Sequence, residues 1–255
     1  MEATMGKRTG IIMFAVLACS LHADPVNITQ YDGEGSGTGW YGSQEDQEVS
    51  NGCVANQNWD LEAFMLDGSS LSLIGGYDFR NGRENFDAGD IFIDVDNNAQ
   101  YGTTLSSSIT GEQVVANTFG WDYVLDLHMD NLTYDVYSLT PQSEVVTVHY
   151  SINADANPWR YASGGALVTS GVIDYVTGLT NDQTGMTGGS HNMLTVDLAF
   201  LDHGQDFTAH NAIQCGNDNI IGKGTVSVPE PGIYSLFVSG FLLLSFVGIS
   251  TKRKK

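Results

Sequence analysis

The sequence predicts an all-β protein built around a single antiparallel β-sandwich domain of jelly-roll-like type, over residues 24–227. Apolar residues recur with a period of 2 rather than 3.6, as in half-buried strands. The chain also contains 30 glycines, and short turn signals separate the apolar segments. No internal repeat or interior linker divides this region, so one domain is expected, with an N-terminal signal peptide before it and a C-terminal transmembrane helix after it.

The first strand pair is predicted where WDLEAFML (59–66) and SLSLIGGY (70–77) flank Asp67-Gly68, a favoured two-residue hairpin turn. The next strand is GDIFIDVD (89–96), in which Ile91, Ile93 and Val95 alternate with a second face that carries Asp90, Phe92, Asp94 and Asp96.

Later strands follow the same rule. WDYVLDLHM (121–129) places Trp121, Tyr123, Leu125, Leu127 and Met129 on one face. Asp130-Asn131 then offers a turn into LTYDVYSL (132–139), which predicts a second hairpin. EVVTVHYSI (144–152) and HNMLTVDLAF (191–200) are further predicted strands.

The charge of the predicted domain is strongly negative. Residues 24–228 contain 4 Lys and Arg against 28 Asp and Glu, which gives 4 − 28 = −24, compared with −20 for the whole chain. Such a surface repels phosphate backbones, so the sequence predicts that the protein does not bind nucleic acid. An acidic surface suits a soluble extracellular protein, or one that collects divalent cations.

The N-terminus has the pattern of a secretory signal peptide over residues 1–23. Lys7 and Arg8 precede an apolar run from Ile11 to Leu21, and signal peptidase cleavage is expected after Ala23. The segment Val16-Leu17-Ala18-Cys19 loosely resembles a lipoprotein box and leaves lipidation as an alternative.

Three features follow one another in residues 228–255. Val228-Pro229-Glu230-Pro231 comes first, then an uncharged apolar run at about 233–249, then the basic residues Lys252, Arg253, Lys254 and Lys255. Seventeen helical residues span about 26 Å, enough for a thin hydrocarbon core. The basic residues should stay in the cytoplasm and place the acidic domain outside. Pro229 keeps the segment before the helix extended, and Pro231 fits a first helical turn.

This combination of Pro-Glu-Pro, membrane span and basic end resembles the PEP-CTERM sorting signal of exosortase-dependent bacterial surface proteins. The resemblance implies that an exosortase recognises Pro229, Glu230 and Pro231, and that the precursor is anchored in the inner membrane until the tail is removed. It further implies delivery to the cell surface or beyond, in bacteria that make extracellular polysaccharide. Segments such as GWYGSQEDQEV, GDIFIDVD and HNAIQCGNDNIIG are similar to parts of the same group, which implies a class but no activity. The alternative is an ordinary membrane anchor.

Two cysteines, Cys53 and Cys215, lie in the predicted domain, and Cys19 lies in the signal peptide. A Cys53–Cys215 disulfide is expected outside the cytoplasm, where it would stabilise the fold by roughly 4 kcal/mol. No CxxC pair is present, so a structural zinc site has no support.

A calcium site is the one cofactor hypothesis that the residues raise. Asp94-Val95-Asp96-Asn97-Asn98 begins like an EF-hand loop, but Ala99 replaces the required glycine and Leu105 the bidentate glutamate. A looser site remains possible, with ligands drawn from Asp87, Asp90, Asp94, Asp96 and Asn98. The alternative is a solvated strand end, and no other cofactor is expected.

Catalysis is not expected, although candidate groups are present. Asp60 and Glu62 alternate onto one strand face and could form the carboxylate pair of a glycoside hydrolase, as could Glu45, Asp46 and Glu48. A histidine pairing with Cys215 is a weaker possibility, from His191, His203 or His210. Aromatic residues in Gly/Ser-rich loops could stack on sugar rings, or could pack at the rim of the core; they are Trp40, Tyr41, Trp159 and Tyr161.

Three functions are therefore expected in decreasing order. The first is a non-catalytic surface or matrix protein associated with extracellular polysaccharide. The second is a calcium-assisted carbohydrate-binding module, and the third is a glycosidase.

Overall fold

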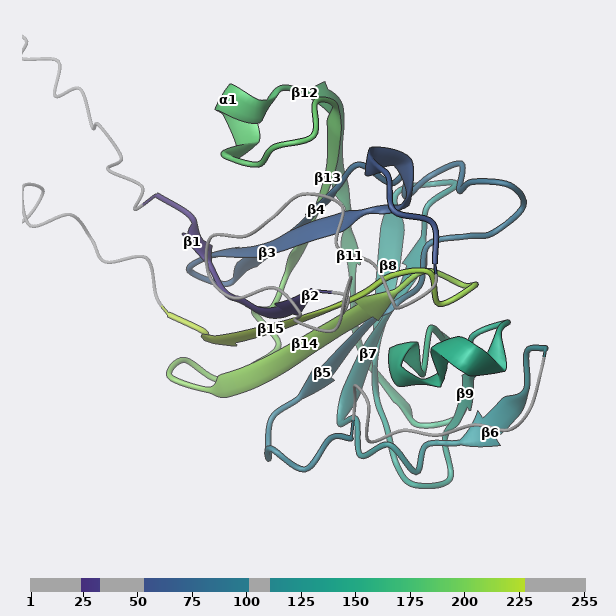
Figure 1. Ribbon diagram of the computed structural model, residues 1–255. Helices are drawn as coiled ribbons and strands as arrows, with labels where there is room; N and C mark the ends of the chain where they lie inside the picture. Colours follow the sequence, from purple (N-terminus) through teal and green to yellow (C-terminus); the bar gives the residue numbers. More distant parts are fainter. Residues whose placement is uncertain (1–23, 33–52, 101–110, 228–255) are drawn as a thin grey trace, which may run out of the picture. The chain divides into compact units, whose positions relative to one another are not determined.

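The computed structural model describes residues 24–32, 53–100 and 111–227. These residues form antiparallel sheets with few and short helices, which confirms the all-β prediction (Figure 1). The predicted signal peptide, sorting motif, membrane span and basic tail lie outside the described residues. Within those residues, no helix is long and apolar enough to cross a membrane.

The first sheet has five strands in the order β1-β3-β4-β13-β12. Their bounds are β1 Val26–Asn27, β3 Leu61–Asp67, β4 Ser70–Gly75, β13 His191–Asp197 and β12 Asp174–Leu179. The β3–β4 hairpin is confirmed: Asp67 pairs with Ser70, and Gly68 takes the positive φ of 64° that the tight turn requires.

The second sheet has seven strands in the order β11-β8-β7-β5-β14-β15-β2. Their bounds are β11 Ala166–Val172, β8 Thr133–Ser138, β7 Tyr123–His128, β5 Ile91–Asp94, β14 Asp206–Ala212, β15 Asn219–Thr225 and β2 Thr29–Asp32. The second predicted hairpin is confirmed, because His128 pairs with Thr133 and the β7–β8 turn carries Asp130 and Asn131.

A third, smaller sheet has the order β10-β9-β6, with bounds β10 Arg160–Ser163, β9 Glu144–Val146 and β6 Val114–Ala116. The strand predicted over 144–152 is therefore shorter than expected. It ends at Val146, and residues Ser151–Ala156 form a 3-10 turn instead. The other short helices are a 3-10 turn at Gln57–Trp59 and α1, Asn181–Thr184, which lies between β12 and β13.

The main core lies between the two large sheets, as in a sandwich. It joins Phe64 and Leu73 of the five-stranded sheet to Ile93, Leu125 and other residues of the seven-stranded sheet, all of them buried. Burial of this apolar surface is the main term that stabilises the domain.

A second cluster lies on the opposite face of the seven-stranded sheet, where the small sheet covers it. Phe92 of β5 and Val124 of β7 pack there against Val145 of β9, with Trp121 beside them. The half-buried pattern predicted for 89–96 is therefore wrong for β5, which is buried on both faces. The face predicted for Trp121 is also wrong, because Trp121 precedes β7 and packs with Val124 rather than with Leu125.

Candidate functional site: a carboxylate cluster at the end of β5

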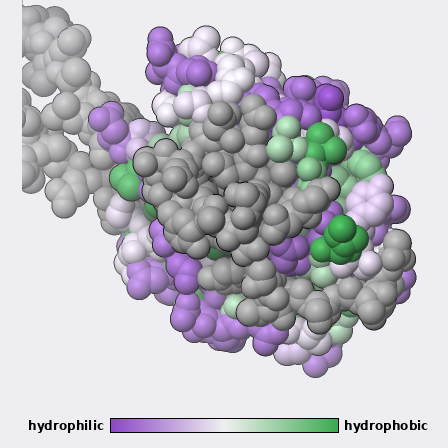
Figure 2. Space-filling view, viewed as in Figure 1, coloured by the Kyte–Doolittle hydropathy of each residue, from purple (hydrophilic) through white to green (hydrophobic). Residues whose placement is uncertain are grey.

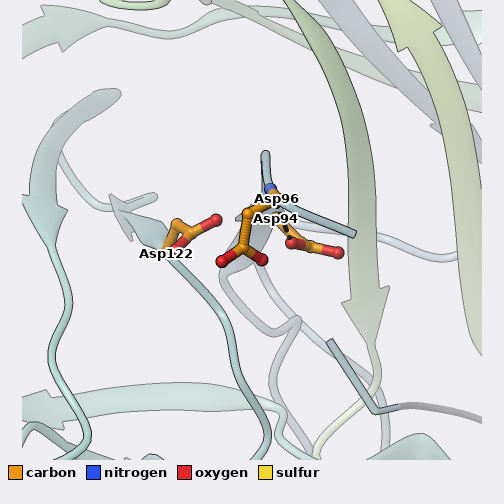
Figure 3. A group of neighbouring side chains, drawn as sticks. All are labelled: Asp94, Asp96 and Asp122. Atoms are coloured by element: carbon orange, nitrogen blue, oxygen red, sulfur yellow. Dashed lines mark hydrogen bonds between the residues drawn. The ribbon is translucent and has the colours of Figure 1, made fainter. Parts of the chain in front are cut away.

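Three carboxylates meet where β5 ends, and they belong to Asp94, Asp96 and Asp122 (Figure 3). Each offers an oxygen that lies within 4.8 Å of the oxygens of the other two. Asp94 is buried, Asp122 is half-buried and Asp96 is exposed. The cluster thus extends from the edge of the core to solvent.

Asp94 shapes the loop that carries Asp96. Its Oδ1 accepts hydrogen bonds from the backbone N–H groups of Asp96 at 3.2 Å and of Asn97 at 3.0 Å. Its Oδ2 accepts one from Ala99 at 3.2 Å. Asn97 has a φ of 62°, a left-handed conformation that Asn tolerates better than most residues. The short side chains of this DVDNN segment therefore bend the chain back on itself directly after the strand.

Asp122 reaches the cluster through strand pairing. The register of β5 and β7 sets Ile93 opposite Tyr123, so the residue before β7 lies beside the end of β5. The backbone N–H of Val95 donates to Asp122 Oδ2 at 2.7 Å, which fixes this carboxylate against the loop.

The neighbouring carboxylates oppose the ionisation of Asp122. Burial raises the pKa of Asp122, and the neighbouring charges of Asp96 and Asp94 raise it further. Ca²⁺ binds six to eight oxygens at 2.3–2.6 Å, so two ligand atoms on opposite sides of the ion lie up to about 5 Å apart. The 4.8 Å limit within the cluster is compatible with that geometry.

The structure does not bring the five predicted calcium ligands together. Asn98 stays with the cluster, where its Nδ2 donates to Asp96 Oδ2 at 2.7 Å. Asp90 lies at the other end of β5, four residues from Asp94, which is roughly 13 Å along a strand. Its two oxygens accept from the backbone N–H groups of Leu127 at 2.9 Å and Tyr161 at 2.8 Å, so it ties β7 and β10 together. Asp87 lines a separate cleft beside Asp90.

The two cysteines lie near the same side chain but are not bonded to each other. Cys53 Sγ contacts Asn153 Oδ1 at 3.4 Å, while Asn153 Nδ2 donates to the carbonyl oxygen of Cys215 at 3.0 Å. Burial raises the pKa of the Cys215 thiol to about 11, and the Cys53 thiol nearby adds to this effect. The predicted disulfide stays a prediction.

Asp60 and Glu62, the predicted glycosidase pair, are both fully buried. Glu62 faces His191, whose Nδ1 lies 2.7 Å from both carboxylate oxygens. The other ring nitrogen of His191 lies 3.0 Å from Asn181 Oδ1 in α1. Glu62 therefore forms an internal polar network that links β3, β13 and α1. Glu62 and His191 lie 129 positions apart, and no sequence motif pairs them.

The remaining candidates are scattered. His210 lies in the other large sheet from His191, with its ring stacked on Trp121 at 5.4 Å between centroids. Trp159 is only 1% exposed and belongs to the core rather than to a sugar platform. Tyr161 is half-buried and stacks on Tyr137. Trp40, Tyr41, Glu45, Asp46 and Glu48 lie outside the described residues.

Comparison of the chain with models of known protein families, with curated proteins and with solved structures gives no match.

Proposed function

We propose that this chain is the precursor of an exported bacterial protein of the cell surface or extracellular matrix, sorted through its Pro-Glu-Pro motif by an exosortase. The observation that carries the proposal is the order of three features in residues 228–255: Pro229-Glu230-Pro231, an apolar run and a basic cluster. The acidic domain, residues 24–227, would be delivered outward, where it associates with extracellular polysaccharide.

The domain has properties that suit this role. It is an all-β body of antiparallel sheets, which we assign to the jelly-roll-like sandwiches. The face drawn in Figure 2 is hydrophilic over most of its described surface, with hydrophobic residues only in isolated places. An excess of acidic residues keeps such a surface soluble outside the cell.

A non-catalytic role is supported by the use that the fold makes of its acidic residues. Asp60 and Glu62 are buried, and Glu62 bonds His191. Both oxygens of Asp90 accept backbone hydrogen bonds. These carboxyl groups hold strands together and are not presented to a substrate in the way that glycoside hydrolysis needs.

A calcium-assisted carbohydrate-binding module is the second candidate, and the cluster of Asp94, Asp96 and Asp122 favours it. A bound Ca²⁺ would neutralise three carboxylates that otherwise repel each other, and would order the loop that follows β5.

Cell fractionation tests the sorting proposal. The full-length chain should accumulate in the inner membrane when no exosortase is present, and a chain truncated before Pro229 should leave the membrane fraction. The anchor is refuted if the truncated chain stays bound to the inner membrane.

A glycan array tests the carbohydrate candidate. Binding to the extracellular polysaccharide of the producing bacterium in calcium but not in chelator would support the calcium-assisted module. Binding of equal strength in both solutions would leave polysaccharide association without calcium. Release of shorter sugars from that polysaccharide would instead establish a glycosidase.

A further inference from the structure

A cleft of about 640 Å³ opens at the end of the seven-stranded sheet away from the carboxylate cluster. It lies between the segment after β4, the β7–β8 turn and the start of β10. Its lining includes the buried residues Asp90, Trp159 and Phe79, the half-buried residues Leu127 and Met129, and several charged side chains. None of these residues belongs to the cluster at Asp94.

The cleft combines two arginines with four aspartates, which are Asp87, Asp90, Asp126 and Asp130. The described residues contain four Lys and Arg, and two of these, Arg80 and Arg160, line this one cleft. Neither forms an ion pair with a described carboxylate, although the charge of Arg160 favours the ionised forms of Asp90 and Asp126. Within the described part of the chain, their guanidinium groups are therefore available to an anion.

Both arginines are held in place by other contacts. Arg160 lies over the indole of buried Trp159, with its Cζ 4.8 Å from the ring centroid. Arg80 Nη2 donates to the carbonyl oxygen of Asp130 at 3.2 Å, which anchors it to the β7–β8 turn. A guanidinium fixed in this way loses less side-chain entropy when it binds a carboxylate through two parallel hydrogen bonds.

A pair of stacked aromatic rings lies near the cleft, although neither ring lines it. Tyr137 of β8 and Tyr161 of β10 lie 4.7 Å apart between centroids, with an interplanar angle of 19°. The register of β7 and β8 sets Asp126 opposite Asp135, two residues from Tyr137, so the rings lie on the strands that neighbour Asp126. Half-buried aromatic residues beside hydrogen-bonding carboxylates are a suitable surface for the C–H face and hydroxyl groups of a sugar ring.

We propose that this cleft binds an acidic saccharide, with a uronate carboxylate on Arg160 and Arg80 and the sugar hydroxyls on Asp126 and Asp87. This inference rests on the proposed association with extracellular polysaccharide and names the class of sugar recognised. The buried carboxyl group of Asp90 adds little to the negative charge of the cleft. Burial raises the pKa of Asp90 to about 8, so this group is mostly uncharged at neutral pH and does not repel an anion.

Binding of oligogalacturonate to the secreted protein, measured by calorimetry, tests the proposal. The matched control ligand is the same oligosaccharide with its carboxyl groups reduced to alcohols. The test variant is Arg160→Gln, an exposed position, and the control variant is Lys223→Gln, an exposed cation that does not line the cleft. Arg80→Gln is a second test variant.

The wild-type protein should bind oligogalacturonate at least about tenfold more tightly than the reduced sugar, with an affinity that falls as salt is added. R160Q and R80Q should lose that preference, and K223Q should keep it. Circular dichroism should show all three variants folded. If R160Q or R80Q is unfolded, Arg160→Lys or Arg80→Lys is used instead, and it should retain part of the preference.

The proposal is overturned if wild type binds neither sugar, if it binds both equally, or if R160Q and R80Q behave as K223Q does. If wild type, R160Q and R80Q all bind the extracellular polysaccharide of the producing bacterium equally well, this inference alone is overturned. The proposed association with polysaccharide would then remain supported.

Discussion

The substitution Asp122→Asn should stabilise the domain in chelator, and it should remove most of the stabilisation that calcium gives to wild type. Without calcium, Asp122 faces Asp94 and Asp96, whose oxygens lie within 4.8 Å. Two unit charges at that distance repel by about 0.9 kcal/mol in water and about 3.5 kcal/mol at an effective dielectric constant of 20. Because Asp96 is exposed and solvent screens its charge, the repulsion energy lies near the lower of these two values.

An asparagine side chain at this position removes two of the three repulsive pairs and can still accept the hydrogen bond from Val95. We therefore expect D122N in chelator to be more stable than wild type by about 1–2 kcal/mol. In calcium at about one hundred times the dissociation constant, wild type gains about 2.7 kcal/mol. That corresponds to a rise in melting temperature of about 5–11 °C for a domain of roughly 200 residues. D122N should show little of that rise.

The assay is thermal unfolding in chelator and in calcium, followed by circular dichroism. Asp126→Asn is the matched control, because Asp126 is also half-buried on the neighbouring stretch of β7, and burial likewise raises its pKa. D126N should keep the full calcium response. The reasoning is refuted if D122N responds to calcium as wild type does, or if it is less stable than wild type in chelator.

Three further predictions follow from burial, cysteine placement and proton binding. Phe92→Ala should lower the free energy of unfolding by about 3–5 kcal/mol, whereas Val172→Ala, at a 75% exposed position, should change it by less than about 0.5 kcal/mol, as denaturant titration would measure. Non-reducing peptide mapping of freshly secreted protein should recover Cys53 linked to Cys215, and two free thiols would exclude the disulfide. The Asp90 carboxyl carbon should titrate near pH 8 by NMR. Because the folded pKa lies above the unfolded value of about 3.9, stability should decline as pH rises from about 4 to 8 and then level off, and this decline should be weaker in D90N.

Features encoded by neighbouring residues could be predicted from the sequence. Asp67-Gly68 and Asp130-Asn131 each specify a turn locally, and both hairpins are present. The bend after β5 is also indicated by the run of short polar residues from Asp94 to Asn98, whose side chains cap their own backbone.

Features that depend on pairing between distant strands could not be predicted from the sequence. Alternation in 89–96 indicated one polar face, but the small sheet of β6, β9 and β10 covers that face and buries Phe92. Asp122 joins Asp94 only because β7 pairs with β5, and nothing near Asp122 in the sequence indicates that register. The pairing of Glu62 with His191 spans 129 positions and depends in the same way on sheet order.

The processing of a Glu230 variant decides whether Pro-Glu-Pro is a sorting signal. Pro229 and Pro231 would keep the segment extended and accessible at a fixed height above the membrane, and an ordinary anchor has no need of the glutamate between them. Glu230→Ala, with the apolar run and basic residues intact, should leave membrane insertion unchanged, abolish the shorter mature form and cause the full-length precursor to accumulate in the inner membrane. Normal maturation of E230A, or equal maturation of wild type in cells that lack an exosortase, would show that the motif is not a sorting signal.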